Sequence, residues 1–154
     1  MNTVFLGLGS NIGQRETNIE QALDALNQHP HTEINSVSPL YETIAVSHFK
    51  QANYLNGAAK IQTLLTPDEL LTFTESIETH LGRTSKGLGD PRTIDIDILF
   101  YNDTVISLDH LSIPHPLAHE RLFVLNPLND IAPDLIHPIL NQSVSELRDQ
   151  LRGY

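Results

Sequence analysis

The segment 92–98, with the sequence RTIDIDI, constrains the fold more than any other part of the chain. Isoleucine occupies every second position of it, and Asp95 and Asp97 stand between the isoleucines. Successive side chains of a β-strand point to opposite faces, so this alternation predicts a strand with one face in the core and both aspartates on the other face. Because aspartate is disfavoured in strands, two of them in such an apolar segment favour a functional role over a merely solvated strand face.

The remaining apolar periodicities place this strand in a small α+β domain. Alternation predicts strands over 3–9, 33–43, 55–64 and 93–101, and helical spacing predicts helices over 13–28 and 66–81 and from about 143. Thr66 with Glu69, and Ser143 with Glu146, have the spacing of capping boxes, which predicts where two of the helices begin. A hairpin-like piece over 102–113 and a proline-punctuated stretch over 114–138 precede the last helix.

The order β-α-β-β-α-β, followed by these C-terminal additions, predicts a ferredoxin-like α+β sandwich. We expect an antiparallel sheet with helices on one face. A chain of 154 residues is long enough for one ordinary core and too short for two, and it contains no linker or internal repeat. The sequence therefore predicts a single domain over 1–154.

The composition argues against several classes of protein. The chain has no cysteine, which excludes disulfides, cysteine-bound zinc and iron–sulfur clusters and suits a reducing cytoplasm. A formal net charge of −10 argues against nucleic-acid binding, since phosphate backbones attract basic surfaces. The N-terminus lacks the pattern of a signal peptide, and no run of about 18 apolar residues predicts a membrane helix. We expect a cytoplasmic monomer that binds neither nucleic acid nor membranes.

Asp95 and Asp97 form a candidate metal site. Two carboxylates at positions i and i+2 of a strand lie roughly 7 Å apart at the backbone, and their tips can converge on two Mg²⁺ ions about 3.5–4 Å apart. Mg²⁺ prefers carboxylate oxygens, and nucleotide phosphates commonly complete its coordination. The alternative is that both side chains lie on a solvated face of the strand without a ligand.

Basic side chains gather around the same strand in the sequence. Four of the nine Lys and Arg residues fall between positions 83 and 121, namely Arg83, Lys86, Arg92 and Arg121. The planar fork of arginine pairs two phosphate oxygens and keeps its charge, so this cluster favours phosphate binding. His115, between two prolines, could donate to a phosphate or to a leaving group. The alternatives are solvated surface cations and a structural histidine.

Two other motifs are weaker. The segment 7–13, GLGSNIG, has the wrong glycine spacing for a dinucleotide-binding fingerprint, and no βαβ pattern supports one. We interpret it as a turn in which glycines allow close packing and Asn11 caps the first helix. His115 and His119 have the i, i+4 spacing of a helical zinc pair, but Pro116 lies within that turn and disfavours a zinc site.

Six segments of the chain form a specific combination. They are GLGSNIG at 7–13, SPLYET at 38–43, YLNGAAKI at 54–61, GR at 82–83, PRTIDIDILFY at 91–101 and IPHPLAHERLFVLNPLNDIAP at 113–133. Together they resemble the 6-hydroxymethyl-7,8-dihydropterin pyrophosphokinase family over about residues 4–137. The resemblance implies a ferredoxin-like fold and two Mg²⁺ ions. It also implies transfer of the β,γ-diphosphate of ATP to the pterin hydroxymethyl group with release of AMP, a step of folate biosynthesis.

The resemblance also assigns expected roles to residues by motif position. Asp95 and Asp97 would hold both metal ions, and the expected catalytic residues are Arg83, Arg92, Asp95 and Asp97. The expected ATP-binding residues are Glu78, Arg83, Lys86, Arg92, Ile98, His115 and Arg121. The expected pterin-binding residues are Thr43, Ile44, Val46, Tyr54, Asn56, Asp95 and Phe123. Asn56 would hydrogen-bond the pterin edge, and Tyr54 and Phe123 would line its ring, although ordinary core packing is the alternative for both aromatic residues. The loops 44–53 and 83–91 would serve as lids.

Two rival functions remain at this point. A nucleotidyl transferase or cyclase also places paired aspartates and two metals on a ferredoxin-like sheet, but it would release pyrophosphate rather than AMP. A binding module without turnover would bind nucleotide or pterin and make no AMP. The feature in its favour is the segment TSKGLGD at 84–90, in a chain without tryptophan, where many family members carry a tryptophan and a further arginine.

Overall fold

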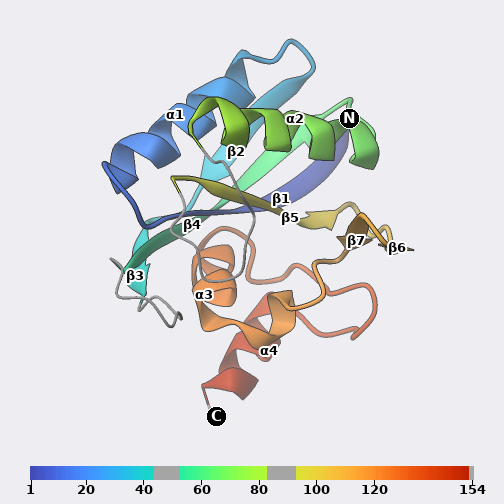
Figure 1. The fold of residues 1–154 in the computed structure, drawn as a ribbon. Helices are drawn as coiled ribbons and strands as arrows, with labels where there is room; N and C mark the ends of the chain where they lie inside the picture. The colour runs from blue at the N-terminus through green and yellow to red at the C-terminus, as the bar shows by residue number, and fades with distance from the viewer. Residues whose placement is uncertain (44–52, 83–92, 153–154) are drawn as a thin grey trace.

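The structure is a computed structural model and describes residues 1–43, 53–82 and 93–152. A single antiparallel sheet has the strand order β2-β4-β1-β5, with the short β3 also paired to β4, and a separate hairpin is formed by β6 and β7 (Figure 1). The elements, in chain order, are β1 (Asn2–Ser10), α1 (Arg15–Gln28), β2 (Thr32–Val37), β3 (Tyr41–Thr43), β4 (Tyr54–Thr63), α2 (Pro67–His80), β5 (Asp95–Tyr101), β6 (Ile106–Leu108), β7 (Leu111–Ile113), a 3₁₀ turn (Ala118–Glu120), α3 (Leu122–Ile131) and α4 (Val144–Leu151).

The predicted ferredoxin-like topology is confirmed. The helices that alternate with the strands, α1 and α2, cover one face of the sheet, and the C-terminal helices α3 and α4 lie on the other face (Figure 1). Each face has its own core cluster. Leu6, Ile19 and Ile96 belong to the cluster beneath α1 and α2, whereas Phe100 and Leu125 belong to the cluster beneath α3 and α4. The sequence predicted C-terminal additions but not that they would cover the second face.

The structure divides the predicted strand 33–43 into β2 and β3. Between them, the Ser38 amide donates to the Ala58 carbonyl at 2.9 Å, and the Ala58 amide donates to Ser38 Oγ at 2.9 Å. A serine side chain thus accepts a bond that a strand carbonyl would otherwise accept, and Pro39 has no amide with which to continue the ladder. The interruption turns the chain so that β3 pairs with the beginning of β4, next to the candidate site.

Helix α3 lies within the proline-punctuated stretch, where no helix was predicted. A proline inside a helix removes one backbone hydrogen bond and normally argues against the helix. Here Pro127 is buried together with Val124, Leu125 and Leu128, so packing against the sheet compensates for the missing bond. Both predicted capping boxes are present, at Thr66–Glu69 and Ser143–Glu146.

The prediction that Asn11 caps the first helix is wrong. Helix α1 begins at Arg15, and its N-cap residue is Gln14, whose side chain makes no capping hydrogen bond. The turn is stabilised instead by Asn18, whose Nδ2 donates to the Ile12 carbonyl at 2.9 Å. Gly13 has φ +68°, a conformation that glycine adopts at little cost.

None of the helices in the described ranges is both long and apolar enough to span a lipid bilayer.

We expect stability to fall on mild acidification, through His137. Its side chain is buried, and Nδ1 accepts from the Ile139 and Leu140 amides, each at 3.2 Å. Desolvation, and then the nearby His119, lower the pKa of His137 below its usual value. Below about pH 6.5, His137 therefore binds a proton in the unfolded chain but stays neutral in the folded chain. The contribution of His137 to the free energy of unfolding is complete above that pH and is lost as pH falls toward the lowered pKa.

A matched variant isolates this contribution. His137→Asn keeps an acceptor close to the position of Nδ1 but does not titrate, so the denaturation midpoint should fall less between pH 7 and pH 5.5 in the variant than in the wild type. Urea denaturation at both pH values measures the two falls. Equal falls would exclude His137 as the source of the acid sensitivity.

Candidate active site

Asp95 and Asp97 lie on the face of β5 that α3 and α4 cover. Ile96 and Ile98 belong to the core cluster on the opposite face, as the alternation predicted. In the register between β1 and β5, Asp95 is the partner of Gly9 and Asp97 is the partner of Gly7. Both carboxylates thus have a glycine as their partner on the neighbouring strand, so no side chain of a paired residue stands beside them. The nearest side chain is that of Leu99 at Gly7 and that of Asn56 at Gly9.

This arrangement fits divalent cations of the Mg²⁺ type. Among the described residues, no group of three His, Asp or Glu side chains gathers at one point. Mg²⁺ needs no such group, because one or two carboxylates, waters and substrate phosphates commonly make up its coordination. The two carboxylates paired with Gly7 and Gly9 lie on one face of β5 and have the right donor chemistry.

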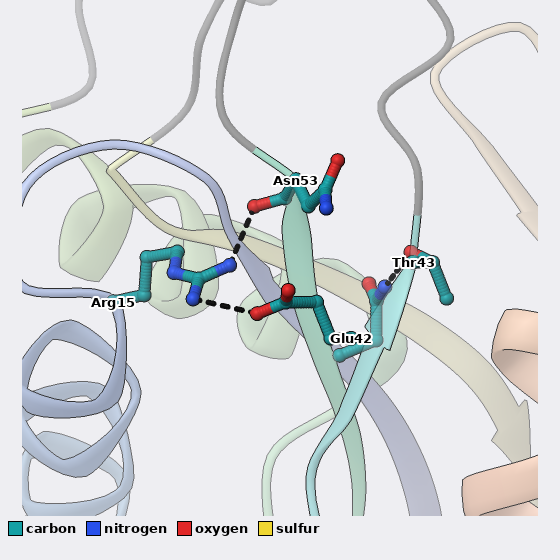
Figure 2. Close-up of polar contacts among 5 residues, drawn as sticks. Arg15, Glu42, Thr43 and Asn53 are labelled. Carbon is teal, nitrogen blue, oxygen red and sulfur yellow. Dashed lines mark hydrogen bonds and ion pairs between the residues drawn. The ribbon is translucent and has the colours of Figure 1, made fainter.

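The row of residues that contains Asp95 continues across the sheet to a buried amide. Gly9 is also the partner of Asn56 on β4, and Asn56 is in turn the partner of Tyr41 on β3. The Asn56 side chain is only 7% exposed, and its Nδ2 donates to Thr43 Oγ1 at 2.7 Å, the bond drawn to Thr43 in Figure 2. The expected pterin residues Asp95 and Asn56 therefore lie in one row across the sheet, and Thr43 is tied to that row by its hydrogen bond with Asn56.

Gly9 fixes how closely these residues approach one another. A Cβ at position 9 would lie 2.9 Å from Asn56 Oδ1 and 3.7 Å from Cδ1 of Tyr54. The first distance is shorter than side chains tolerate, so the Asn56 amide occupies its observed position only because residue 9 is glycine. The sequence indicated close packing at this turn but not its partner, since the partner depends on the register of two distant strands.

Replacing Gly9 with alanine should weaken pterin binding by about 10- to 100-fold, because the new methyl group displaces the Asn56 amide and misplaced groups lose binding steeply. Equilibrium binding of 6-hydroxymethyl-7,8-dihydropterin without ATP measures this effect. Gly7→Ala is the matched control, since its Cβ would meet nothing nearer than Leu99 at 3.5 Å. An unchanged pterin affinity in Gly9→Ala would show that the position of the Asn56 amide is unimportant.

His115 and Arg121 approach the aspartates from the segment that follows β7. The His115 amide donates to the Leu99 carbonyl of β5 at 3.0 Å, and His115 Nδ1 accepts from the Leu117 amide at 3.1 Å. Desolvation and the charge of Arg121 lower the pKa of His115, against a smaller opposite effect of Asp95. The neutral ring, with Nδ1 as an acceptor, carries its proton on Nε2 and can donate it to a phosphate oxygen.

Phe123 lies at the start of α3 and is 38% exposed. The Arg121 guanidinium lies 5.4 Å from the centre of its ring, a cation–π geometry. An aromatic ring with this exposure is available for a ligand, in contrast to Phe100, which is fully buried. Core packing therefore does not account for Phe123.

Glu78 on α2 occupies a different kind of position. Its side chain is only 2% exposed, and Oε2 accepts from the Ile96 amide at 2.8 Å. Ile96 stands between Asp95 and Asp97 on the edge strand of the sheet, so Glu78 holds the strand that carries the metal candidates. The expected contact of Glu78 with a nucleotide stays a prediction. The Ile98 side chain is buried in the core, so an ATP contact at this residue would have to come from its backbone.

Five of the expected site residues lie outside the described residues, and so do nearly all of the two expected lid loops. These five residues are Ile44, Val46, Arg83, Lys86 and Arg92. Their expected roles in binding pterin and triphosphate stay predictions.

The comparisons with known proteins concern nearly the whole chain. The family model for 7,8-dihydro-6-hydroxymethylpterin-pyrophosphokinase (HPPK) matches residues 5–133. The chain is 48% identical over 130 residues to the 2-amino-4-hydroxy-6-hydroxymethyldihydropteridine pyrophosphokinase of Bacillus subtilis, which covers 84% of this chain and 78% of that protein. It is 41% identical over 150 residues to the protein of the same name from Aquifex aeolicus, which covers 97% of this chain and 92% of that protein.

The fold is also similar to a solved structure, that of Plasmodium falciparum HPPK-DHPS wild type with pteroate. The TM-score is 0.77 at 20% sequence identity, and the match covers 97% of this chain and 42% of that chain. The chain therefore spans less than half the length of the solved protein, and at this identity the likeness concerns the fold alone.

Proposed function

The chain belongs to the 7,8-dihydro-6-hydroxymethylpterin-pyrophosphokinase family, and we propose that it carries out the family's reaction with two Mg²⁺ ions held by Asp95 and Asp97. The reaction transfers pyrophosphate from ATP to the hydroxymethyl group of the dihydropterin, a step of folate biosynthesis. The observation that supports the metal proposal most directly is that both carboxylates lie on one face of β5, each paired with a glycine of β1 that adds no side chain beside it. We propose that the protein acts as a monomeric single domain.

The proposed phosphate site lies on the side of β5 that His115 approaches. His115 donates from Nε2 to a phosphate oxygen, and Arg121 supplies a fixed positive charge beside it. When bound at Asp95 and Asp97, Mg²⁺ would neutralise phosphate charge and would lower the pKa of the attacking hydroxyl group, so no dedicated general base would be required. Glu78 contributes by holding the Ile96 amide between the two aspartates, and Ile98 would contribute through its backbone. The remaining proposed triphosphate ligands are Arg83, Lys86 and Arg92.

The proposed pterin site lies on the same face of the sheet as the proposed phosphate site, on the strands β3 and β4. Asn56 offers the pterin edge both a donor and an acceptor from one amide, and Thr43 fixes the orientation of that amide. Tyr54 and Phe123 line the ring, where aromatic side chains stack well. Ile44 and Val46 complete the proposed contacts. Holding both substrates in line contributes most of the catalysis in transfers of this type, because the protein has little covalent chemistry to perform.

The test is a product analysis. The purified protein is incubated with ATP, MgCl₂ and 6-hydroxymethyl-7,8-dihydropterin, and AMP and pyrophosphate are quantified with and without EDTA. We expect pterin-dependent AMP that EDTA abolishes, and a rate that still rises with free Mg²⁺ after all ATP is complexed, as a second ion requires. Pyrophosphate as the product would indicate nucleotidyl transfer, and pterin binding without AMP would indicate a binding module.

A further inference from the structure

Arg15 connects three elements beside the proposed pterin site. Its Nη2 donates to Glu42 Oε1 of β3 at 2.7 Å, and its Nη1 donates to the Asn53 carbonyl, directly before β4, at 2.8 Å (Figure 2). Arg15 itself is the first residue of α1. One guanidinium therefore holds the end of β3 and the start of β4 against α1, the helix on the opposite face of the sheet from Asn56 and Asp95.

The position of Arg15 is unfavourable for a cation unless it has a specific partner. The N-terminus of a helix carries partial positive charge, which disfavours arginine there, and the N-cap residue Gln14 makes no side-chain bond that would offset this. Hydrogen bonds from Arg15, and then from Asn53, lower the pKa of Glu42, so the glutamate is ionised at neutral pH and supplies that partner. Arg15 thus has an electrostatic reason to be here only in the presence of Glu42.

The residues that Arg15 holds are the direct neighbours of pterin-site residues. Thr43 follows Glu42, Tyr54 follows Asn53, and Thr43 and Tyr54 are partners in the pairing of β3 with β4. Thr43 also accepts the hydrogen bond that orients the Asn56 amide. A displacement of Glu42 or Asn53 would therefore pass directly to the two residues that set the position of that amide.

β3 has few other means of holding its place. It comprises only three residues, and its ladder consists of three residue pairs with β4. On the α3 face, Tyr41 donates a hydrogen bond from its hydroxyl group to Asp130. Glu42 points to the opposite face, toward α1, where Arg15 binds it. The short strand is thus anchored from both faces, and removing Arg15 takes away the link from β3 to α1.

We propose that Arg15, through its ion pair with Glu42, is a positioning residue that sets the affinity for the pterin and not for ATP. The proposal rests on the proposed function, in particular on the pterin site around Thr43 and Asn56. Arg15 touches neither substrate. It acts by fixing the ends of β3 and β4, and hence the geometry of the bond between Thr43 and Asn56.

The test is a comparison of Michaelis constants in charge variants. Arg15→Gln should raise the KM for the pterin about tenfold, as expected when hydrogen bonds to a charged group are lost, with the KM for ATP and kcat within about twofold. Arg15→Lys keeps the charge but not the two-pronged geometry, so its KM should be intermediate. The double variant that combines Arg15→Glu with Glu42→Arg restores an ion pair. It should recover part of the pterin affinity that Arg15→Glu alone loses. Arg152→Gln, an exposed arginine after α4, is the control for loss of one positive charge.

The outcomes separate this proposal from its alternatives. A merely structural role would raise both KM values together and lower the unfolding midpoint, and an unchanged pterin KM in Arg15→Gln would exclude the positioning role; either result overturns the proposal. Direct binding of the pterin without ATP is measured on the same proteins. If the wild type binds pterin but makes no AMP, the proposed function is overturned. The comparison of pterin affinities between the wild type and the Arg15 variants then still decides the proposal. A wild type that binds no pterin overturns both.

Discussion

Replacing Asp97 with asparagine should lower kcat for pterin-dependent AMP formation by about 10³-fold. The substitution keeps the size of the side chain and removes the negative charge that holds a divalent cation, and losing one such stabilising group costs on the order of 10²–10³ in rate or more. Asp97 is paired with Gly7 on the face of β5 opposite to Ile96 and Ile98, and asparagine keeps the shape of the side chain there. Asp95→Asn should give a loss of similar size.

The control for this prediction is Asp103→Asn, which removes a carboxylate from the exposed turn directly after β5. It should leave kcat within about twofold and both KM values unchanged. The metal dependence provides a second reading, because a weakened metal site should require more MgCl₂ for half-maximal rate in Asp97→Asn. If Asp97→Asn kept the kcat of the wild type and reached half its maximal rate at the same MgCl₂ concentration, Asp97 would not be a metal ligand.

The local signals of the sequence predicted the parts of the fold that depend on short-range interactions. Both capping boxes form as their spacing indicated, and the alternation over 93–101 correctly places Asp95 and Asp97 on one face of a strand. These features involve residues within one helical turn or one strand, so a single sequence contains all the information that they need.

The features that could not be predicted depend on contacts between distant segments. The break between β2 and β3 follows from hydrogen bonds between Ser38 and Ala58, and α3 exists despite Pro127 because the sheet buries it. In the site, the closeness of Gly9 to Asn56 and the reach of Arg15 to Glu42 depend on strand register and on the placement of α1. An arginine at a helix start carries no local signal of its partner.

Asn56→Leu is expected to weaken pterin binding on the order of 10²-fold while ATP binding stays within about twofold. Leucine has a similar volume and fits the buried site next to Gly9, but it can neither donate nor accept a hydrogen bond, and a site that has lost a polar group for its ligand discriminates steeply against that ligand. Titration of the pterin and of ATP separately, by calorimetry, measures the two effects independently.

Thr43→Val separates the role of the Asn56 amide from that of its orientation. Valine keeps the branched shape of threonine and removes only the hydroxyl group that accepts from Asn56 Nδ2 at 2.7 Å. The amide is then present but free to rotate, so the loss of pterin affinity should be smaller than in Asn56→Leu, about 3- to 10-fold, as for one neutral hydrogen bond. If Thr43→Val matched Asn56→Leu, orientation alone would account for binding. If Asn56→Leu bound pterin like the wild type, the pterin edge would have to be recognised elsewhere in the chain.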